Sequence, residues 1–152
     1  MSSIHEEVNT ALRNAWNLPE GGAFPPPLHE ALRLRWTAYE PKRHLQATCV
    51  FPESWVAFDG VGGGGLGAAF ETVAQSFACL LAHKRCALLN LECTTLRHLK
   101  PGGGEVEIET QIRATRKSIV FIEGILRDHE RQVLVHASAT YAALKSDRPN
   151  GE

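Results

Sequence analysis

The residues whose types and spacing could do chemistry lie in one stretch, residues 60–83. Glycine occupies position 60 and positions 62–65, and an apolar pattern follows in which Glu71 is the one acid. If a helix begins at these glycines, its first backbone N–H groups lack intrahelical partners and carry a partial positive charge. Glycine lets another molecule approach those groups closely. The stretch therefore predicts a cradle for an anion or oxyanion, with a carboxylate two helical turns further on.

The apolar pattern predicts one long helix that is buried over most of its circumference. Glu71 and Gln75 lie one turn apart, on a different face from the apolar stripe. The stripe recurs at helical spacing and consists of Leu66, Phe70, Val73, Phe77, Leu80 and Leu81. Blander interpretations stay open, because Glu71 could face solvent, Gln75 could be an ordinary polar helix residue, and the glycines could only connect two elements.

A nucleotide-binding interpretation of the glycines is disfavoured. The spacing of Gly60, Gly62 and Gly65 fits a dinucleotide-binding fingerprint, which is a weak signal when it stands alone. That fingerprint belongs to alternating strand–helix units with a parallel sheet. Here a run of strands joined by short turns follows a single helix. A phosphate loop is absent too, since no lysine occurs between Lys42 and Lys84.

The rest of the chain must supply the elements that position this helix. Alternation of apolar and polar residues predicts strands over residues 32–39, 44–51, 87–96, 105–114, 119–127 and 133–144. Glu105, Glu107 and Glu109 lie two apart, which is typical of the solvated face of a strand rather than of a metal site. Hairpins beside one buried helix predict an α+β fold in which an antiparallel sheet wraps around that helix.

The N-terminal residues form a separate segment. Ser3 and Glu6 have the spacing of a capping box, so a short helix is expected to begin there and to end near Asn17. A linker rich in Pro and Gly follows. The predicted organisation is therefore an N-terminal helix and linker (1–30), one domain (31–146) and a polar tail (147–152). The helix could pack on its own domain or on a partner subunit.

Composition narrows the class of protein. The chain has 152 residues and a net charge of −1, which suits one globular domain and gives no support for a nucleic-acid partner. No signal peptide or uninterrupted membrane span is expected. The four cysteines lack zinc-site spacing and are expected to be reduced and buried, with Cys79 and Cys93 in apolar patterns. We expect a cytoplasmic protein.

At this point the residues resemble the hotdog-fold acyl-CoA thioesterases, especially the phenylacetate-pathway (PaaI-like) type. The resemblance covers about residues 45–145 and rests on the order of the motifs. Members carry His-Gly-Gly at the start of the central helix and an Asp or Glu nine positions after the His. Here Gly62-Gly63-Gly64 occupies the motif, and Glu71 stands nine positions after Gly62. Residues 90–92, 99–102 and 137–144 also look like this family.

The resemblance implies hydrolysis of an acyl-CoA to free acid and CoA, without a metal or redox cofactor. Glu71 would be the catalytic carboxylate, as general base or nucleophile. The Gly63 N–H would donate to the thioester oxygen, where charge grows in the transition state. Gln75 would help to position water or acid. The sites of this fold form between two subunits, so a homodimer or a dimer of dimers is implied.

Further residues are expected to contact the substrate. Arg116 and Lys117 belong to the densest basic group and could bind CoA phosphates, although a solvated turn is the alternative. The remaining expected contacts are Gly62, Gly64, Phe58, Asp59 and Asn90, and Phe70 and Val73 are expected to line the acyl pocket.

Two polar residues that members of the family carry at the site are replaced in this sequence. Gly62 stands where the motif has His, and Val56 stands where members often have Asn. A non-catalytic protein that binds acyl-CoA or an acyl carrier therefore stays open as the alternative. A hydratase is disfavoured, because no Asp–His pair lies at suitable spacing near the helix.

Overall fold

The computed structural model describes residues 2–18, 24–57 and 60–145. The helices are α1 (Ile4–Ala15), α2 (Pro27–Ala31), a 3₁₀ turn at Glu53–Trp55 and α3 (Gly63–Ala82). The strands are β1 (Arg35–Glu40), β2 (His44–Val50), β3 (Cys86–Thr95), β4 (Glu105–Arg116), β5 (Ile119–Arg127) and β6 (Val133–Ala143). The long helix and the strands thus follow the predicted order along the chain.

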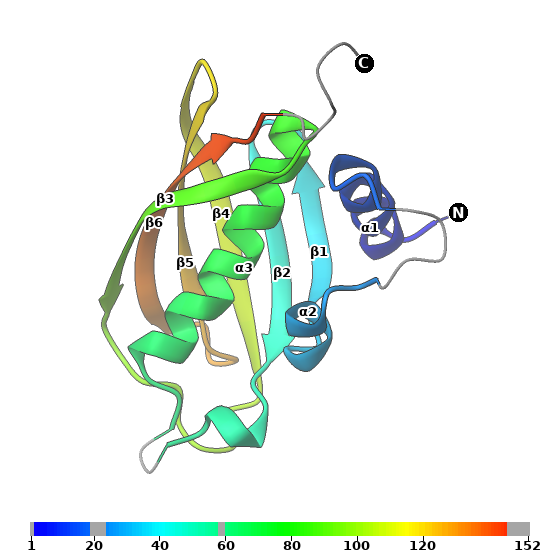
Figure 1. Ribbon diagram of the computed structural model, residues 1–152. Helices are drawn as coiled ribbons and strands as arrows, with labels where there is room; N and C mark the ends of the chain where they lie inside the picture. Colours follow the sequence, from blue (N-terminus) through cyan, green and yellow to red (C-terminus); the bar gives the residue numbers. More distant parts are fainter. Residues whose placement is uncertain (1, 19–23, 58–59, 146–152) are drawn as a thin grey trace.

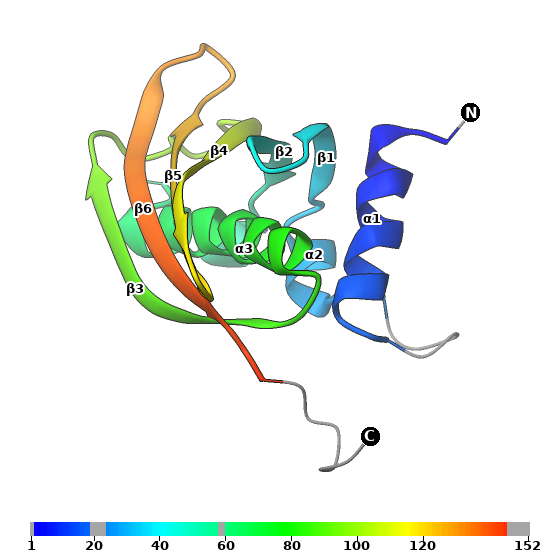
Figure 2. The ribbon, with the colours of Figure 1, turned by 90° about the horizontal axis from the view of Figure 1, so that it is seen from above.

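The strands form one antiparallel sheet in the order β1-β2-β4-β5-β6-β3. The sheet curves around α3, which crosses its concave face (Figures 1 and 2). This is the predicted α+β arrangement, a sheet wrapped around one long helix. β3 follows α3 directly in the chain but pairs with β6, so it lies at one edge of the sheet and β1 at the other.

The predicted stripe of α3 is the side that packs on the sheet. Leu66, Phe70, Val73 and Phe77 are completely buried, while Leu81 is only partly buried. The helix comes close to the sheet at Gly124, where an added Cβ would lie 2.9 Å from Cε2 of Phe70 and 2.1 Å from the Glu109 carbonyl oxygen. Phe70 and Val73 therefore belong to the core, and the expectation that they line the acyl pocket is wrong.

The N-terminal helix packs on its own domain. The capping box is present as predicted, with Ser3 accepting from the N–H of Glu6, and the helix ends at Ala15. Val8 and Leu12 have no exposed surface, because α1 lies against β1 and α3 (Figure 2). The N-terminal helix is thus part of the same hydrophobic core.

The linker contains a helix that the sequence interpretation missed. α2 begins at Pro27, a residue type that suits the first helical position because its ring presets the backbone angle and its missing N–H needs no partner there. Leu32 ends this helix, and Arg33 has φ of +49°. Strand β1 therefore starts at Arg35, later than expected.

Strand β3 leaves apolar side chains in solvent. Leu88, Leu89 and Leu91 are 40%, 58% and 36% exposed. Cys93 is exposed as well, so the expectation that it is buried is wrong, whereas Cys49, Cys79 and Cys86 are buried and all four thiols are free. The reason is position: β3 is an edge strand, so one of its sides has no neighbouring strand within the chain.

Among the described helices, α3 has the length and apolar composition of a membrane span. Of its most apolar window, 67% is buried inside the fold. Its apolar side chains therefore serve as the core of the domain.

Candidate active site

Glu71 lies in the middle of α3, outside the completely buried stripe that packs on the sheet. Its carboxylate is only partly buried, and Gln75 stands one turn further along the same face. The hydroxyl of Tyr141, a completely buried side chain on β6, lies 3.3 Å from Oε1 of Glu71 and 3.3 Å from its backbone carbonyl oxygen. This hydroxyl can donate to either oxygen, which ties the carboxylate to the sheet.

The surroundings of Glu71 favour its protonated form. Burial raises the pKa of the Glu71 carboxyl, and the Tyr141 hydrogen bond opposes that shift. Burial also raises the pKa of Tyr141, reinforced by the Glu71 charge, so the tyrosine stays a donor. A carboxylate with a raised pKa is a stronger base, which suits proton transfer near neutral pH.

The Glu71 side chain opens into a cavity of about 510 Å³ between α3 and the N-terminal segment. Gln75 and Cys79 continue the helix wall, and Trp16 and Leu28 lie on the opposite side. The cavity places Glu71 and Gln75 together, as predicted from their spacing.

The glycines form the start of α3. Gly62 is the N-cap without a side-chain cap, and Gly63 is the first helical residue. An added Cβ on Gly63 would lie 2.6 Å from Oγ1 of Thr95, whereas one on Gly64 would meet nothing within 4 Å. The helix start is therefore pressed against the end of β3 at Gly63 and open at Gly64.

His98 also lies at this helix start. A Cβ on Gly62 would be 3.7 Å from Nε2 of His98. Nothing in the spacing of His98 along the sequence links it to residue 62. The loop after β3 brings them together.

Glu71 and Gly63 stand too far apart to act on one carbonyl within a single chain. They are eight residues apart on one helix, which corresponds to about 12 Å along its axis. In a working site, the general base lies within about 3 Å of the attacking water or the carbonyl carbon, and the N–H donor lies within about 3 Å of the carbonyl oxygen. Both groups must therefore lie around one carbonyl. Either residue can therefore form half of a site in one chain.

The other predicted contact residues are not brought to Glu71. Asn90 pairs with Thr140, whereas Leu91 pairs with Ala139, and Ala139 shares its sheet face with Tyr141. Asn90 thus points to the face away from α3, and the structure does not support it as a partner of Glu71 in the same chain. Phe58 and Asp59 lie outside the described residues.

Arg116 and Lys117 lie at the far end of the sheet from the glycines. Ile119, which pairs with Arg116, is next to Ala142, and Ala142 pairs with Ala87 near the start of β3. Thr95, beside Gly63, is at the other end of β3, roughly 26 Å away at about 3.3 Å per residue. These two basic residues cannot join the helix start of their own chain.

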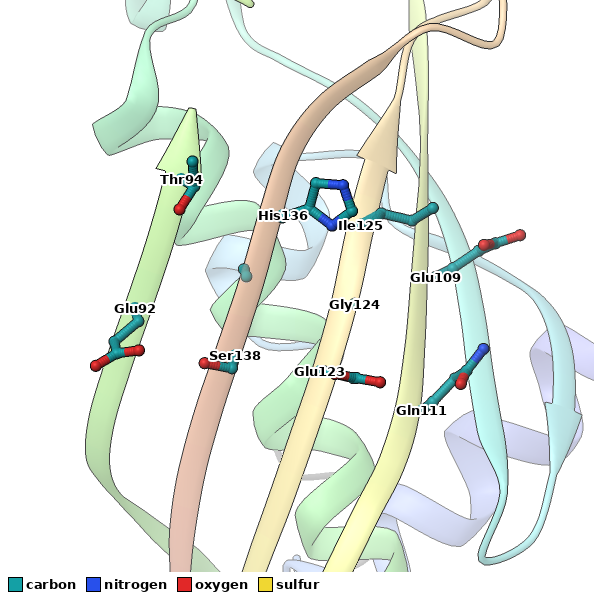
Figure 3. A pocket seen from close by; sticks show the side chains of 10 residues that line it. Glu92, Thr94, Glu109, Gln111, Glu123, Gly124, Ile125, His136 and Ser138 are labelled. Carbon is teal, nitrogen blue, oxygen red and sulfur yellow. The ribbon is translucent and has the colours of Figure 1, made fainter. Parts of the chain in front are cut away.

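A second cavity, of about 450 Å³, lies on the outer face of the sheet. Figure 3 shows Glu92, Glu123 and His136 on this face with α3 behind the strands. Glu123 is paired with Arg113 at 3.0 Å, and Glu109 with Arg127 at 2.7 Å. Among the described residues, no three His, Cys, Asp or Glu side chains are arranged to hold a metal ion. The face therefore adds nothing to the chemistry of Glu71.

Sequence reasoning missed Tyr141 and Trp16 as parts of the site. Tyr141 is the one hydroxyl-bearing aromatic on the buried face of a strand made mostly of Ala and Val. A buried tyrosine needs a hydrogen-bond partner, so this was a usable signal. Trp16 carried no such signal, because its place depends on how α1 packs.

Comparison with solved structures identifies the fold. The thioesterase HI1161 from Haemophilus influenzae has a TM-score of 0.72 at 16% identity, over 99% of this chain and 96% of that one. The E. coli PaaI protein from the phenylacetic acid degradation operon has a TM-score of 0.72 at 12% identity, over 95% and 98%. The chain has the hotdog fold.

A further hotdog structure contains a ligand. A hypothetical thioesterase from Streptococcus pneumoniae TIGR4, solved with coenzyme A, has a TM-score of 0.67 at 12% identity, over 78% of this chain and 92% of that one. No family model and no curated protein matches the sequence. At these identities the likeness extends to the fold, and the chemistry must be argued from the site.

Proposed function

We propose that this hotdog protein hydrolyses an acyl-CoA thioester to a free acid and CoA. The observation that carries the proposal is Glu71, a partly buried carboxylate with a raised pKa that opens into a cavity on a thioesterase-type fold. The S. pneumoniae protein that contains coenzyme A shares this fold, which supports a CoA-type ligand.

The proposed reaction needs only groups of this chain and water. Glu71 either takes a proton from water as it attacks the thioester carbonyl or attacks the carbonyl itself to form an anhydride that water then opens. In both routes the C–S bond breaks and CoA leaves as the thiolate. In the general-base route, the proton that Glu71 took from water passes to sulfur. In the anhydride route, the carboxylic acid formed when water opens the anhydride gives its proton to the thiolate, and Glu71 is released as the carboxylate. The N–H of Gly63 stabilises the charge that builds on the carbonyl oxygen.

We propose that a second copy of the chain completes the site. The separation of Glu71 from Gly63 along one helix supports this proposal, because one carbonyl must meet both groups. Strand β3 offers the surface: it is an edge strand with Leu88, Leu89 and Leu91 exposed. An unpaired edge with exposed apolar side chains is a template for pairing with another chain.

The first test compares wild type with Glu71→Gln on a panel of acyl-CoAs, measuring release of free thiol. We expect the variant to lose roughly 10²–10⁴-fold in kcat, the range for general acid–base catalysis. Equal turnover by both proteins would contradict the role of Glu71. Saturable binding by wild type without any hydrolysis would instead favour the binding-protein alternative.

A second test separates the effect of losing the Gly63 N–H from the effect of adding a side chain at this position. Gly63→Pro removes the N–H at a first helical position, where proline is well tolerated. Gly63→Ala keeps the N–H but introduces the same Cβ contact with Thr95. We expect Pro to cost roughly 10²–10³-fold more in kcat than Ala, the range for one oxyanion donor.

Mixing the two inactive variants tests whether the site is shared. A heterodimer of Glu71→Gln and Gly63→Pro chains would contain one site with both groups intact. After exchange of equal amounts, about a quarter of the wild-type rate should return, since half of the dimers are mixed and each has one good site of two. No recovery on mixing, with subunit exchange verified, would place both groups in one chain.

The oligomer itself is tested by light scattering. Leu91→Lys on β3 should shift the protein towards monomer and lower its activity, because a charge at the proposed interface must be desolvated. Phe121→Lys is the matched control, since Phe121 is 40% exposed on β5 and away from this edge. An oligomer unaffected by Leu91→Lys would exclude the β3 edge.

A further inference from the structure

The cavity next to Glu71 is built jointly by α3 and the N-terminal arm, defined as residues 4–18 and 24–31. Trp16, Leu18 and Leu28 come from the arm. Glu71, Gln75 and Cys79 recur every four residues along α3 and form the facing wall. Glu71 to Cys79 corresponds to about 12 Å along the helix. The cavity is thus an elongated space that leads away from the carboxylate.

The arm wall is fixed by packing in the core. Val8 and Leu12 of α1 have no exposed surface. His29 of α2 lies between two indoles, with ring centroids 5.8 Å from Trp16 and 5.8 Å from Trp36. A wall held in this way presents a constant shape, so it can select among ligands by size.

At one part of the cavity, Trp16 of the arm meets Cys79 near the end of α3. Cys79 lies beside the Cys86 thiol and the Trp16 indole, and these two neighbours lower the pKa of Cys79 to about 7 against the effect of burial. Leu144 adds an apolar side chain at this end. Trp16 is therefore in contact range of the helix and limits how far a ligand can extend.

The cavity offers little to a charged ligand beyond the carboxylate itself. Among the described residues, the other charged side chain that lines the cavity is Arg85, which is exposed. Its guanidinium donates to the backbone carbonyl oxygen of Trp16 at 3.3 Å. The remaining lining is apolar apart from Gln75, Thr72, His29 and the two thiols. Pockets of this type bury the apolar part of a ligand and orient it by few polar groups.

We propose that this cavity holds the acyl group of the substrate, which is an uncharged hydrophobic acyl chain, and that Trp16 and Leu28 of the arm set its maximum length. This inference rests on the proposed hydrolysis: the thioester carbonyl lies at Glu71 and the chain runs along α3 towards Cys79. Each methylene buried there should raise kcat/KM about fourfold until the chain reaches Trp16.

The test measures kcat/KM for straight-chain acyl-CoAs from acetyl to palmitoyl. In wild type we expect a rise with length followed by a decline at one chain length. Trp16→Ala should move that maximum to longer chains, because it removes the indole that lies beside Cys79. Leu28→Trp should move it to shorter chains, so that kcat/KM falls more for long chains than for acetyl-CoA. Ile4→Trp, on an exposed position of the arm outside the cavity, should leave the profile unchanged.

Two results would overturn the assignment. One is a maximum that moves in neither variant, and the other is a loss in Leu28→Trp that is equal for acetyl and long chains. If Trp16→Ala is misfolded by circular dichroism, Trp16→Phe and Leu28→Trp carry the test.

Binding of S-alkyl-CoA thioethers, which cannot be hydrolysed, separates this inference from the proposed function. Chain-length-dependent binding that Leu28→Trp shortens, without hydrolysis of any thioester, would support the acyl cavity and overturn the hydrolase. Binding that is independent of chain length would overturn the cavity assignment.

Discussion

The hydroxyl of Tyr141 lies 3.3 Å from Oε1 of Glu71 and equally far from the Glu71 carbonyl oxygen. It joins the last strand of the sheet to the proposed catalytic carboxylate, across 70 residues of sequence. Because the phenol is completely buried, its O–H needs an acceptor, and both of these acceptors belong to Glu71. The position and the basicity of Glu71 should therefore both depend on this one group.

Tyr141→Phe should raise the pKa of Glu71 further. The hydrogen bond favours the charged carboxylate, so its removal leaves burial unopposed. The acid limb of kcat/KM should move to higher pH, and about 1 kcal/mol of stability should be lost with the hydrogen bond. The measurement is a pH–rate profile, with Tyr39→Phe as a matched change elsewhere in the protein. An unmoved acid limb would show that Tyr141 has only a packing role.

Glu71→Gln should make the folded protein more stable at neutral pH. The pKa of Glu71 is raised in the folded state, so its stabilising contribution is largest when the carboxyl is protonated and declines as pH rises above about 4.5. A neutral amide removes that decline. Chemical denaturation at pH 5 and pH 8 measures it, and the gain should be larger at pH 8. A variant less stable than wild type at pH 8 would contradict this.

His29 should make the protein sensitive to acid. Burial lowers the pKa of His29 from 6.5 to about 4, so the unfolded state binds the proton first and stability falls as pH drops from 6.5 to 4. The loss amounts to about 3 kcal/mol. His29→Gln should flatten this part of the stability curve in urea titrations, and the exposed His136→Gln should not. Parallel curves for wild type and His29→Gln would refute the assignment.

Gly124→Ala should be strongly destabilising. Its Cβ would lie 2.1 Å from the Glu109 carbonyl oxygen and 2.9 Å from Phe70, so either the strand pair or the helix must shift. Overpacking of this kind costs about 1–3 kcal/mol or more. Gly64→Ala is the control: its Cβ meets nothing within 4 Å, and alanine in a helix is favoured by up to about 1 kcal/mol. Thermal unfolding should order the two variants on opposite sides of wild type.

The sequence by itself determined the long helix, the strands and the shared face of Glu71 and Gln75. These features depend on periodicity along the chain, which reports the face that a side chain takes within its own element. The capping box of α1 was predictable for the same reason, because Ser3 and Glu6 interact over one turn. Local patterns thus carried most of the fold.

Only the tertiary structure decided which elements meet. A bulge between Leu88 and Asn90 puts Leu88 on the same face as Leu91, and no alternation pattern reveals where such an extra residue falls. Cys93 is exposed because β3 pairs with β6 and ends the sheet, which depends on strand order. Trp16 and Tyr141 reach the cavity and the carboxylate through packing between distant segments. Such contacts follow from the three-dimensional arrangement of the whole chain, and no pattern local to one element encodes them.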